Sequence, residues 1–432
     1  MPSVSDIIQA LQMEFFYTAQ AINGSDDPAF TITYRFETSV PEDDITGRTG
    51  WSSWSAAEES AVLSALAHIE TFLNVDFVAA DPGEDADLSL GLVTQPEGVA
   101  GYGGAELWTW EDGSFYSYDG FATFDKTLDL TENFNLILHE LGHALGLEHT
   151  FDGVALDAAY DSNHYSVMSY TADPESGENN DAMMIYDLLA LQNIWGAAAY
   201  STGDDSYTGP RTGNVDTIWD TGGIDWIRYS GPLDCQISLA PFVFDQGAVR
   251  IGGISQVRGV HGGFMIADDF TNVLWRDQGG FRGVLIENAA GGRGADGIEG
   301  NSMANRLFGG AGPDGVFGRG GADVLFGGRG NDVLEGGRGR DRLDGGLGRD
   351  LLTGGHGSDL FVFSSGSGTD RIADFSEGDR IDLRRHAEAT SVEAVLAAAR
   401  DTAGGVRLAL GEDRLFLDGI GLEALGAEDF LL

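Results

Sequence analysis

Cysteine, basic residues, histidine and long apolar runs are all scarce in this chain of 432 residues. The single cysteine, Cys235, excludes an internal disulfide. Lysine and arginine number 24 against 69 aspartates and glutamates, which gives a formal net charge of −45. Nucleic-acid binding needs a basic surface that this composition does not offer. No apolar run approaches the length of a membrane span. We therefore expect no nucleic-acid partner and no membrane-spanning segment.

Three of the eight histidines fall within one short stretch, residues 139–149, which reads HELGHALGLEH. His139 and His143 are one helical turn apart and lie on the same face of a helix. Gly146 can end that helix in a left-handed conformation, which lets His149 return as a third ligand. Three protein ligands with an open fourth position are typical of catalytic zinc, whereas four indicate a structural zinc. We therefore predict one catalytic zinc ion bound by His139, His143 and His149.

Glu140 follows the first predicted ligand and offers a carboxylate beside the metal. Zinc lowers the pKa of bound water and polarises the carbonyl group of a substrate. Glu140 would accept the proton of the attacking water and return it to the leaving amine. The alternative is that these are helix histidines satisfied by backbone carbonyls. That alternative is disfavoured because the extended pattern rarely arises by chance.

A second pattern occupies the C-terminal half of the chain. From Gly291 the sequence repeats every nine residues as Gly-Gly-x-Gly-x-Asp-x-apolar-x, the repeats-in-toxin (RTX) nonapeptide. Glycine turns alternating with short strands predict a parallel β-roll with the apolar side chains inside. The apolar positions are Ile298, Leu307, Val316, Leu325, Leu334, Leu343, Leu352 and Phe361.

Stacked turns of this kind bring carboxylates and glycine carbonyls together as oxygen ligands for several calcium ions. The predicted calcium ligands in the repeats are Gly292, Gly294, Asp296, Gly310, Gly312, Asp314, Gly321, Asp323, Gly328, Gly330, Asp332, Gly337, Gly339, Asp341, Gly346, Gly348, Asp350, Gly355, Gly357 and Asp359. The acidity of the chain agrees with this prediction, because cations offset its self-repulsion. A surface adapted to a saline habitat is a second explanation for part of the charge.

Two units of the repeat are irregular. Asn305 stands in an aspartate position, in a unit that begins Gly300-Asn301-Ser302-Met303 and lacks the full glycine set, and Arg319 replaces a glycine. We expect the calcium sites that border these units to be weak or absent. A flexible glycine-rich linker is the alternative, but a linker has no reason to keep the aspartate and apolar positions in phase.

Together the two patterns resemble the serralysin branch of the metzincin zinc metalloproteases. The resemblance also rests on Ser166-Val167-Met168-Ser169-Tyr170, which matches the methionine-containing turn of that family. It implies that Met168 is an apolar floor beneath the metal. It implies that Tyr170 is a switchable further zinc ligand whose hydroxyl assists catalysis. It also implies calcium ligands ahead of the repeats, namely Arg211, Gly213, Asp220, Gly222, Gly223, Asp225 and Glu287. An ordinary turn residue is the alternative for each of these seven.

The resemblance implies an α/β metzincin catalytic domain, with a twisted mixed sheet and helices, followed by an all-β parallel β-roll domain. The expected divisions are an N-terminal segment at 1–24, interpreted as a vestigial pro-region, the zinc protease domain at 25–205, a β-sandwich and β-roll at 206–362, and a cap with a type I secretion signal at 363–432. Local periodicity predicts strands at 31–37, 75–78 and 88–92, an edge strand at 106–110, and helices at 56–74, 132–145 and 181–195.

The predicted function is that of a secreted, monomeric zinc endopeptidase that binds extended protein or peptide substrates at the sheet edge. Residues 1–24 lack the basic start and apolar core of a signal peptide. The resemblance to serralysins implies export by a type I secretion apparatus, and the acidic-then-apolar end Glu428-Asp429-Phe430-Leu431-Leu432 resembles its signal. Two alternatives stay open. One is a calcium-binding secreted adhesin or interaction protein with a vestigial zinc site, against which the intact Glu140 argues. The other is a protease directed at one particular matrix or surface protein.

Overall fold

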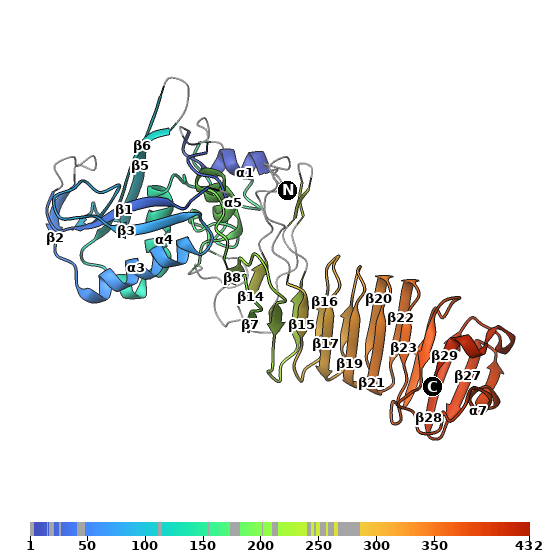
Figure 1. The fold of residues 1–432 in the computed structure, drawn as a ribbon. Coiled ribbons are helices and arrows are strands. Elements are labelled where there is room, and N and C mark those ends of the chain that lie inside the picture. Colours follow the sequence, from blue (N-terminus) through green and yellow to red (C-terminus); the bar gives the residue numbers. More distant parts are fainter. Residues whose placement is uncertain are drawn as a thin grey trace.

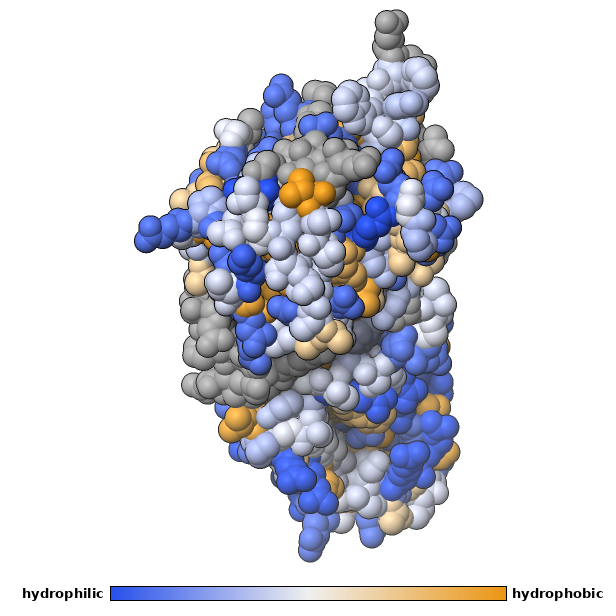
Figure 2. Space-filling view, turned by 90° about the vertical axis from the view of Figure 1, so that its left-hand side faces the viewer, coloured by the Kyte–Doolittle hydropathy of each residue, from blue (hydrophilic) through white to orange (hydrophobic). Residues whose placement is uncertain are grey.

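The computed structural model describes residues 4–14, 16, 21–25, 27–40, 48–110, 115–153, 155–172, 182–200, 202–209, 215–239, 243–245, 248–250, 256–257, 263–266 and 286–432. Its N-terminal part mixes helices and strands, and a long stack of strands extends from it to the C-terminus (Figure 1). The prediction of an α/β part followed by a parallel β-roll is confirmed. In the described segments, no helix is both long and apolar enough to cross a membrane. The face seen in Figure 2 is mostly hydrophilic, with scattered apolar residues.

The N-terminal part is built around a six-stranded sheet. Its strands are β1 (Phe30–Glu37), β2 (Thr49–Ser52), β3 (Val75–Ala79), β4 (Leu88–Thr94), β5 (Gly101–Thr109) and β6 (Phe115–Asp125). Their order is β3-β1-β4-β6-β5, with β2 also paired to β4, and every pair is parallel except β2–β4 and β5–β6. β5 is therefore an antiparallel edge strand, as predicted, although it spans Gly101–Thr109 and not 106–110. Its outer edge offers backbone groups to an added strand.

The helices described in this part are α1 (Val4–Leu11), α3 (Ala56–Glu70), α4 (Phe134–Ala144) and α5 (Ile185–Trp195), with a 3₁₀ turn, η1 (Leu130–Glu132), before α4. α3 begins with a capping box between Ser55 and Glu58. It ends before the predicted residue 74 because Phe72 and Leu73 turn into the core, where they are 2% and 1% exposed. α5 begins later than the predicted 181 because Met184 is extended, and its N–H is bound by the Asp187 carboxylate.

The N-terminal segment packs inside this part of the molecule. Ile7 and Leu11 of α1 are fully buried. Leu11 O accepts the N–H of Glu148 at 2.7 Å, and Met13 N–H donates to Gly146 O at 2.9 Å. The segment therefore supports the loop that connects α4 to His149. Its origin as a vestigial pro-region stays a prediction.

Most of the C-terminal strands form two facing sheets that are mostly parallel, and β11–β12 and β8–β14 form two separate pairs. The strands in this region are β7 (Ser206–Thr208), β8 (Val215–Ile218), β9 (Trp226–Arg228), β10 (Cys235–Ser238), β11 (Val243–Asp245), β12 (Ala248–Arg250), β13 (Gln256–Val257), β14 (Gly263–Ile266), β15 (Asn288–Ala290), β16 (Gly297–Glu299), β17 (Arg306–Ala311), β18 (Gly315–Phe317), β19 (Val324–Gly330), β20 (Val333–Gly339), β21 (Arg342–Gly348), β22 (Leu351–Gly357), β23 (Leu360–Val362), β24 (Thr369–Ile372), β25 (Arg380–Asp382), β26 (Ala399–Thr402), β27 (Gly405–Leu410), β28 (Asp413–Asp418) and β29 (Phe430–Leu431).

One sheet has the order β13-β10-β16-β18-β20-β22-β24-β28-β27-β26, and the other β29-β25-β23-β21-β19-β17-β15-β9-β7. Consecutive nonapeptides alternate between the two sheets, so each strand pairs with the strand two units later. Leu325 thus lies between Leu307 and Leu343. All eight predicted apolar positions of the repeats are at most 1% exposed and form the core between the sheets.

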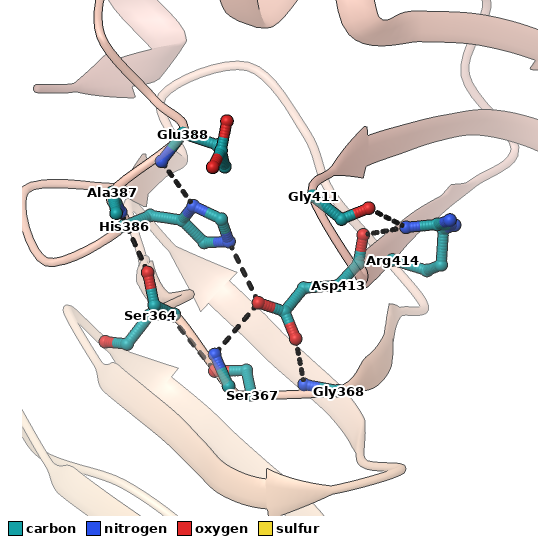
Figure 3. Close-up of polar contacts among 11 residues, drawn as sticks. Ser364, Ser367, Gly368, His386, Ala387, Glu388, Gly411, Asp413 and Arg414 are labelled. Carbon is teal, nitrogen blue, oxygen red and sulfur yellow. Dashed lines mark hydrogen bonds and ion pairs between the residues drawn. The ribbon is translucent and has the colours of Figure 1, made fainter.

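The C-terminal end of the stack is closed by antiparallel β26–β28 and by α7 (Val392–Ala398). A buried polar cluster joins loops of this cap that are distant in sequence (Figure 3). The Asp413 carboxylate accepts the N–H of Gly366 at 2.8 Å, that of Gly368 at 2.9 Å and that of His386 Nε2 at 3.2 Å. The other ring nitrogen of His386 accepts the N–H of Glu388 at 3.3 Å. The cluster leaves no polar atom of the His386 ring without a partner, which is what a buried structural histidine requires.

Candidate metal centre and calcium sites

The three predicted zinc ligands converge on one point. α4 places the rings of His139 and His143 with centroids 4.9 Å apart. Gly146, at φ +108°, reverses the chain after α4 and returns His149 to the same place. One nitrogen of each ring lies within 4.8 Å of the other two, and the Nε2 atoms of His143 and His149 are 3.1 Å apart. Two nitrogens that bind one tetrahedral zinc ion are about 3.3 Å apart, from Zn–N bonds of about 2.05 Å.

Each of the three rings is oriented through its other nitrogen. The acceptors are carbonyl or carboxylate oxygens, so Nδ1 carries the proton and Nε2 presents its lone pair. Partners of this kind fix the orientation of metal-binding histidines. The bonds are His139 Nδ1 to Val167 O at 2.8 Å, His143 Nδ1 to Leu147 O at 2.7 Å and His149 Nδ1 to Asp152 Oδ2 at 2.7 Å.

The three imidazole rings are suited to binding a metal ion and not to being protonated. Burial lowers the pKa of His139 to about 4 and the pKa of His143 to about 3. Both rings are therefore neutral at neutral pH, and their lone pairs face one another with no proton between them. A cation removes that repulsion, and a site of three imidazole nitrogens suits zinc.

Glu140 lies in a cavity of about 610 Å³ that is also lined by the three histidines, Tyr170 and the first half of β5. It is 4% exposed, and burial raises the pKa of its carboxyl group to about 8. A cation bound at the histidines would favour the ionised form instead. Two glycines of β5 permit this close approach. A Cβ on Gly101 would lie 2.5 Å from Glu140 Oε1, and one on Gly103 would lie 2.2 Å from Glu140 O.

Tyr170 and Met168 also lie at the histidine cluster. The Tyr170 hydroxyl is 2.9 Å from His149 Nε2, and the residue is 70% exposed at the mouth of the cavity. Met168 is fully buried against α4, where a Cβ on Gly142 would lie 2.8 Å from its Sδ. The positions agree with the roles that the sequence predicts, a switchable ligand and an apolar floor, and the roles themselves stay predictions.

Asp187 of α5 supports this centre, although no motif singles it out. It is fully buried and accepts hydrogen bonds from Ser166 Oγ at 2.6 Å, Val167 N at 2.9 Å and Met184 N at 2.9 Å. Val167 in turn provides the carbonyl that orients His139. Burial raises the pKa of Asp187 to about 7. The available signal was the only charged residue of a largely apolar helix, because a buried carboxylate needs partners.

The repeat aspartates carry oxygen atoms that have no hydrogen-bond partner. Six of them are at most 3% exposed, and the Oδ2 atom of each has no donor. Their other oxygen accepts a backbone N–H from the adjacent coil turn, as Asp314 does from Asp296 at 2.8 Å. A buried carboxylate oxygen without a donor is costly, and a hard cation between the turns removes that cost. The six that fit calcium in this way are Asp314, Asp323, Asp332, Asp341, Asp350 and Asp359.

A further acidic cluster lies where the two sheets begin. Carboxylate oxygens of Asp205, Asp220 and Asp225 are within 4.8 Å of one another. Asp225 is fully buried and its Oδ2 has no partner, while Glu287 Oε2 accepts the Asp225 N–H at 2.9 Å. The structure thus brings together the predicted Asp220, Asp225 and Glu287. Asp205 was not predicted. It joins them because β7 pairs with β9, a contact that local sequence does not reveal.

The glycines of this turn, Gly222 and Gly223, have φ values of +159° and +132°. A Cβ on Gly223 would lie 2.0 Å from Gly203 O, so the turn passes close to the segment that carries Asp205. Arg211 and Gly213, the other two predicted ligands of this region, lie outside the described residues.

Comparison with known proteins finds one matching family and several similar proteases. The RTX calcium-binding nonapeptide repeat family (4 copies) matches residues 299–334 and 335–372. Serralysin of Photorhabdus laumondii is 30% identical over 65% of this chain and 60% of its own length. Metallopeptidase AprA of Pseudomonas marginalis is 31% identical over 63% of this chain and 61% of its own length. Serralysin G of Dickeya chrysanthemi is 29% identical over 64% of this chain and 60% of its own length.

The chain spans about 60% of the length of these curated relatives. Their similarity covers most of this chain, and the repeat family covers a stretch in which the structure shows stacked parallel strands. The chain is therefore serralysin-like in sequence and carries an RTX repeat domain.

Proposed function

We propose that this chain is a zinc-dependent endopeptidase in which Glu140 is the general base. The observation that carries the proposal is the convergence of His139, His143 and His149 beside a buried carboxylate, in a cavity that follows the edge strand β5. Similarity to serralysins and to a metallopeptidase supports the same reaction.

A zinc ion bound at the three histidines would supply a Lewis acid that polarises the scissile carbonyl and lowers the pKa of water. Glu140 takes up the proton of the attacking water and delivers it to the leaving amine. Tyr170, with its hydroxyl at the mouth of the cavity, donates a hydrogen bond to the oxygen on which negative charge develops. The edge strand β5 orients the substrate by pairing with its extended backbone.

We also propose that the protein works outside the cell, where calcium binds its repeats. Calcium bound between the repeat turns stabilises the C-terminal stack, because unpartnered Oδ2 atoms line it. Calcium ions are plentiful outside cells, so the protein acts there. Its export through a type I apparatus is proposed from the similarity to serralysins. A monomer completes the proposal. The catalytic domain corresponds to 25–205, the sandwich and β-roll to 206–362, and the cap with the export signal to 363–432.

Glu140→Gln tests the proposal in the calcium-loaded full-length chain with unfolded casein as substrate. We expect cleavage to fall by about a hundred- to ten-thousandfold, the usual size of a general acid–base contribution. Zinc content, measured by elemental analysis, should stay at the wild-type level because the ligands are intact. Glu132→Gln, an exposed glutamate in η1, is the matched control and should cleave normally. Wild-type cleavage by E140Q would refute the base role. Absence of both zinc and cleavage in the wild-type protein would favour the calcium-binding adhesin instead.

A further inference from the structure

Side-chain amides fill one turn of the repeat stack, residues 300–305 between β16 and β17. Asn305 Oδ1 accepts the N–H of Asn301 at 2.9 Å, and Asn305 Nδ2 donates to Glu287 O at 2.9 Å and to Asn301 Oδ1 at 3.1 Å. Asn301 Oδ1 also accepts the N–H of Met303 at 2.9 Å. Asn301 is 7% exposed and Asn305 is 1% exposed, so the two amides form a buried network that is satisfied by the protein itself.

Asn301 connects the two sheets. Its Nδ2 donates to Leu239 O at 3.3 Å and to Ile286 O at 3.0 Å. Leu239 follows β10, which belongs to one sheet, and Ile286 precedes β15, which belongs to the other. A single side chain therefore holds the sheets together near the point where the stack meets the N-terminal part.

This turn differs from the regular turns in how its buried polar side chains are satisfied. In the regular turns that follow, the Oδ2 atom of the buried aspartate has no donor, and a cation is the partner that it lacks. In the turn 300–305 the Nδ2 groups of Asn301 and Asn305 donate to the carbonyls of Ile286 and Glu287 in the preceding layer. A calcium ion there would face N–H groups instead of oxygens, so this layer does not fit calcium.

The second irregular unit keeps the calcium arrangement. Arg319 has φ +73°, the left-handed region that its glycine counterparts Gly328 and Gly337 also occupy. The aspartate of the same unit, Asp323, retains an Oδ2 atom without a donor. Of the two units that were expected to border weak calcium sites, only the asparagine unit is therefore incompatible with the ion.

We propose that the turn 300–305 is a calcium-independent lock. Its two asparagine amides take the place of an ion and keep the sheets joined at the base of the stack when calcium is absent. The regular turns that follow carry uncompensated carboxylates and depend on calcium. The proposal concerns folding and does not depend on the proposed protease activity.

Hydrogen exchange of the full-length chain in calcium-free buffer tests the lock. In the wild-type protein we expect the amides of β15–β17 to exchange about ten- to a hundredfold more slowly than those of β20–β22, because only the former layer has its polar groups satisfied without calcium. Asn305→Asp replaces a donor by a carboxylate and should abolish that difference, and calcium should restore protection. Asn331→Asp makes the same charge change at an exposed position and should leave the difference intact.

Two results would overturn the proposal. One is equal exchange of β15–β17 and β20–β22 in the calcium-free wild-type protein. The other is a calcium ion between residues 301–305 and 286–287 in the anomalous scattering of wild-type crystals grown with calcium. The second measurement decides the question even if the Asn305→Asp variant does not fold.

Discussion

Asp187 offers a sharp test of how the zinc centre is held. Its buried carboxylate accepts three hydrogen bonds, from Ser166, Val167 and Met184, at 2.6 to 2.9 Å. Each buried donor left without a partner costs about 1–3 kcal/mol, and such costs are only partly additive. We therefore expect Asp187→Ala to lower the free energy of unfolding by about 3–5 kcal/mol. Asp187→Asn keeps the shape and one accepting oxygen, so its loss should be about 1–2 kcal/mol.

The same substitutions should weaken zinc binding, although Asp187 does not contact the metal. It holds Val167, whose carbonyl orients His139, and loss of such an outer partner typically lowers metal affinity about ten- to a hundredfold. Urea unfolding of the metal-free protein and zinc competition with a chromogenic chelator measure the two effects. Asp76→Asn, at an exposed position of β3, is the control and should change neither. Wild-type stability and zinc affinity in Asp187→Asn, or equal stability of the alanine and asparagine variants, would refute the reasoning.

Two further predictions concern close packing and the acidic repeats. Gly142→Ala should lower the melting temperature, with a net cost of about 1 kcal/mol, because its Cβ would lie 2.8 Å from Met168 Sδ. Gly404→Ala has nothing within 4 Å and serves as its control; identical melting of the two variants would contradict the packing argument. Burial raises the pKa of Asp314 and of Asp323 to about 7, whereas the pKa of an aspartate in the unfolded chain is about 3.9. The folded repeats hold these protons more tightly than the unfolded chain does, so calcium-free stability is highest below about pH 4 and falls as pH rises towards about 7. Urea unfolding at several pH values checks this, calcium should reverse the loss, and a calcium-free stability that rises over this range would contradict it.

Much of the fold follows from patterns that need only neighbouring residues. The Ser55 cap of α3 and the strands β1, β3 and β4 lie where the sequence places them. β2 and β6 were not predicted, and β5 begins at Gly101, earlier than the predicted 106. The ends of elements are less predictable, because contacts distant in sequence decide them. α3 ends before Phe72 and Leu73, which lie in the core. α5 begins after Met184, whose N–H donates to the Asp187 carboxylate.

The residues of the candidate metal centre and of the acidic cluster also fall into two groups, those that a local motif reveals and those that only tertiary packing reveals. His139 and His143 are brought together by the period of a helix, and His149 by a glycine that can reverse the chain, so a local motif was enough to find all three. Asp187 and Asp205 carry no such motif. Packing brings each of them against residues that are distant in sequence, Asp187 against Val167 and Asp205 against Asp220 and Asp225.

The nine-residue period by itself determined the parallel stack, its inward apolar positions and its aspartate-lined turns, because each unit repeats one local conformation. Only the tertiary structure shows which turns leave a buried carboxylate oxygen without a donor. The Oδ2 atoms of six repeat aspartates have no donor, whereas Asn301 and Asn305 donate to carbonyls of the preceding layer. Whether a buried polar atom is satisfied by the chain or requires an ion depends on the layer beside it in space, and the repeat pattern does not describe that layer.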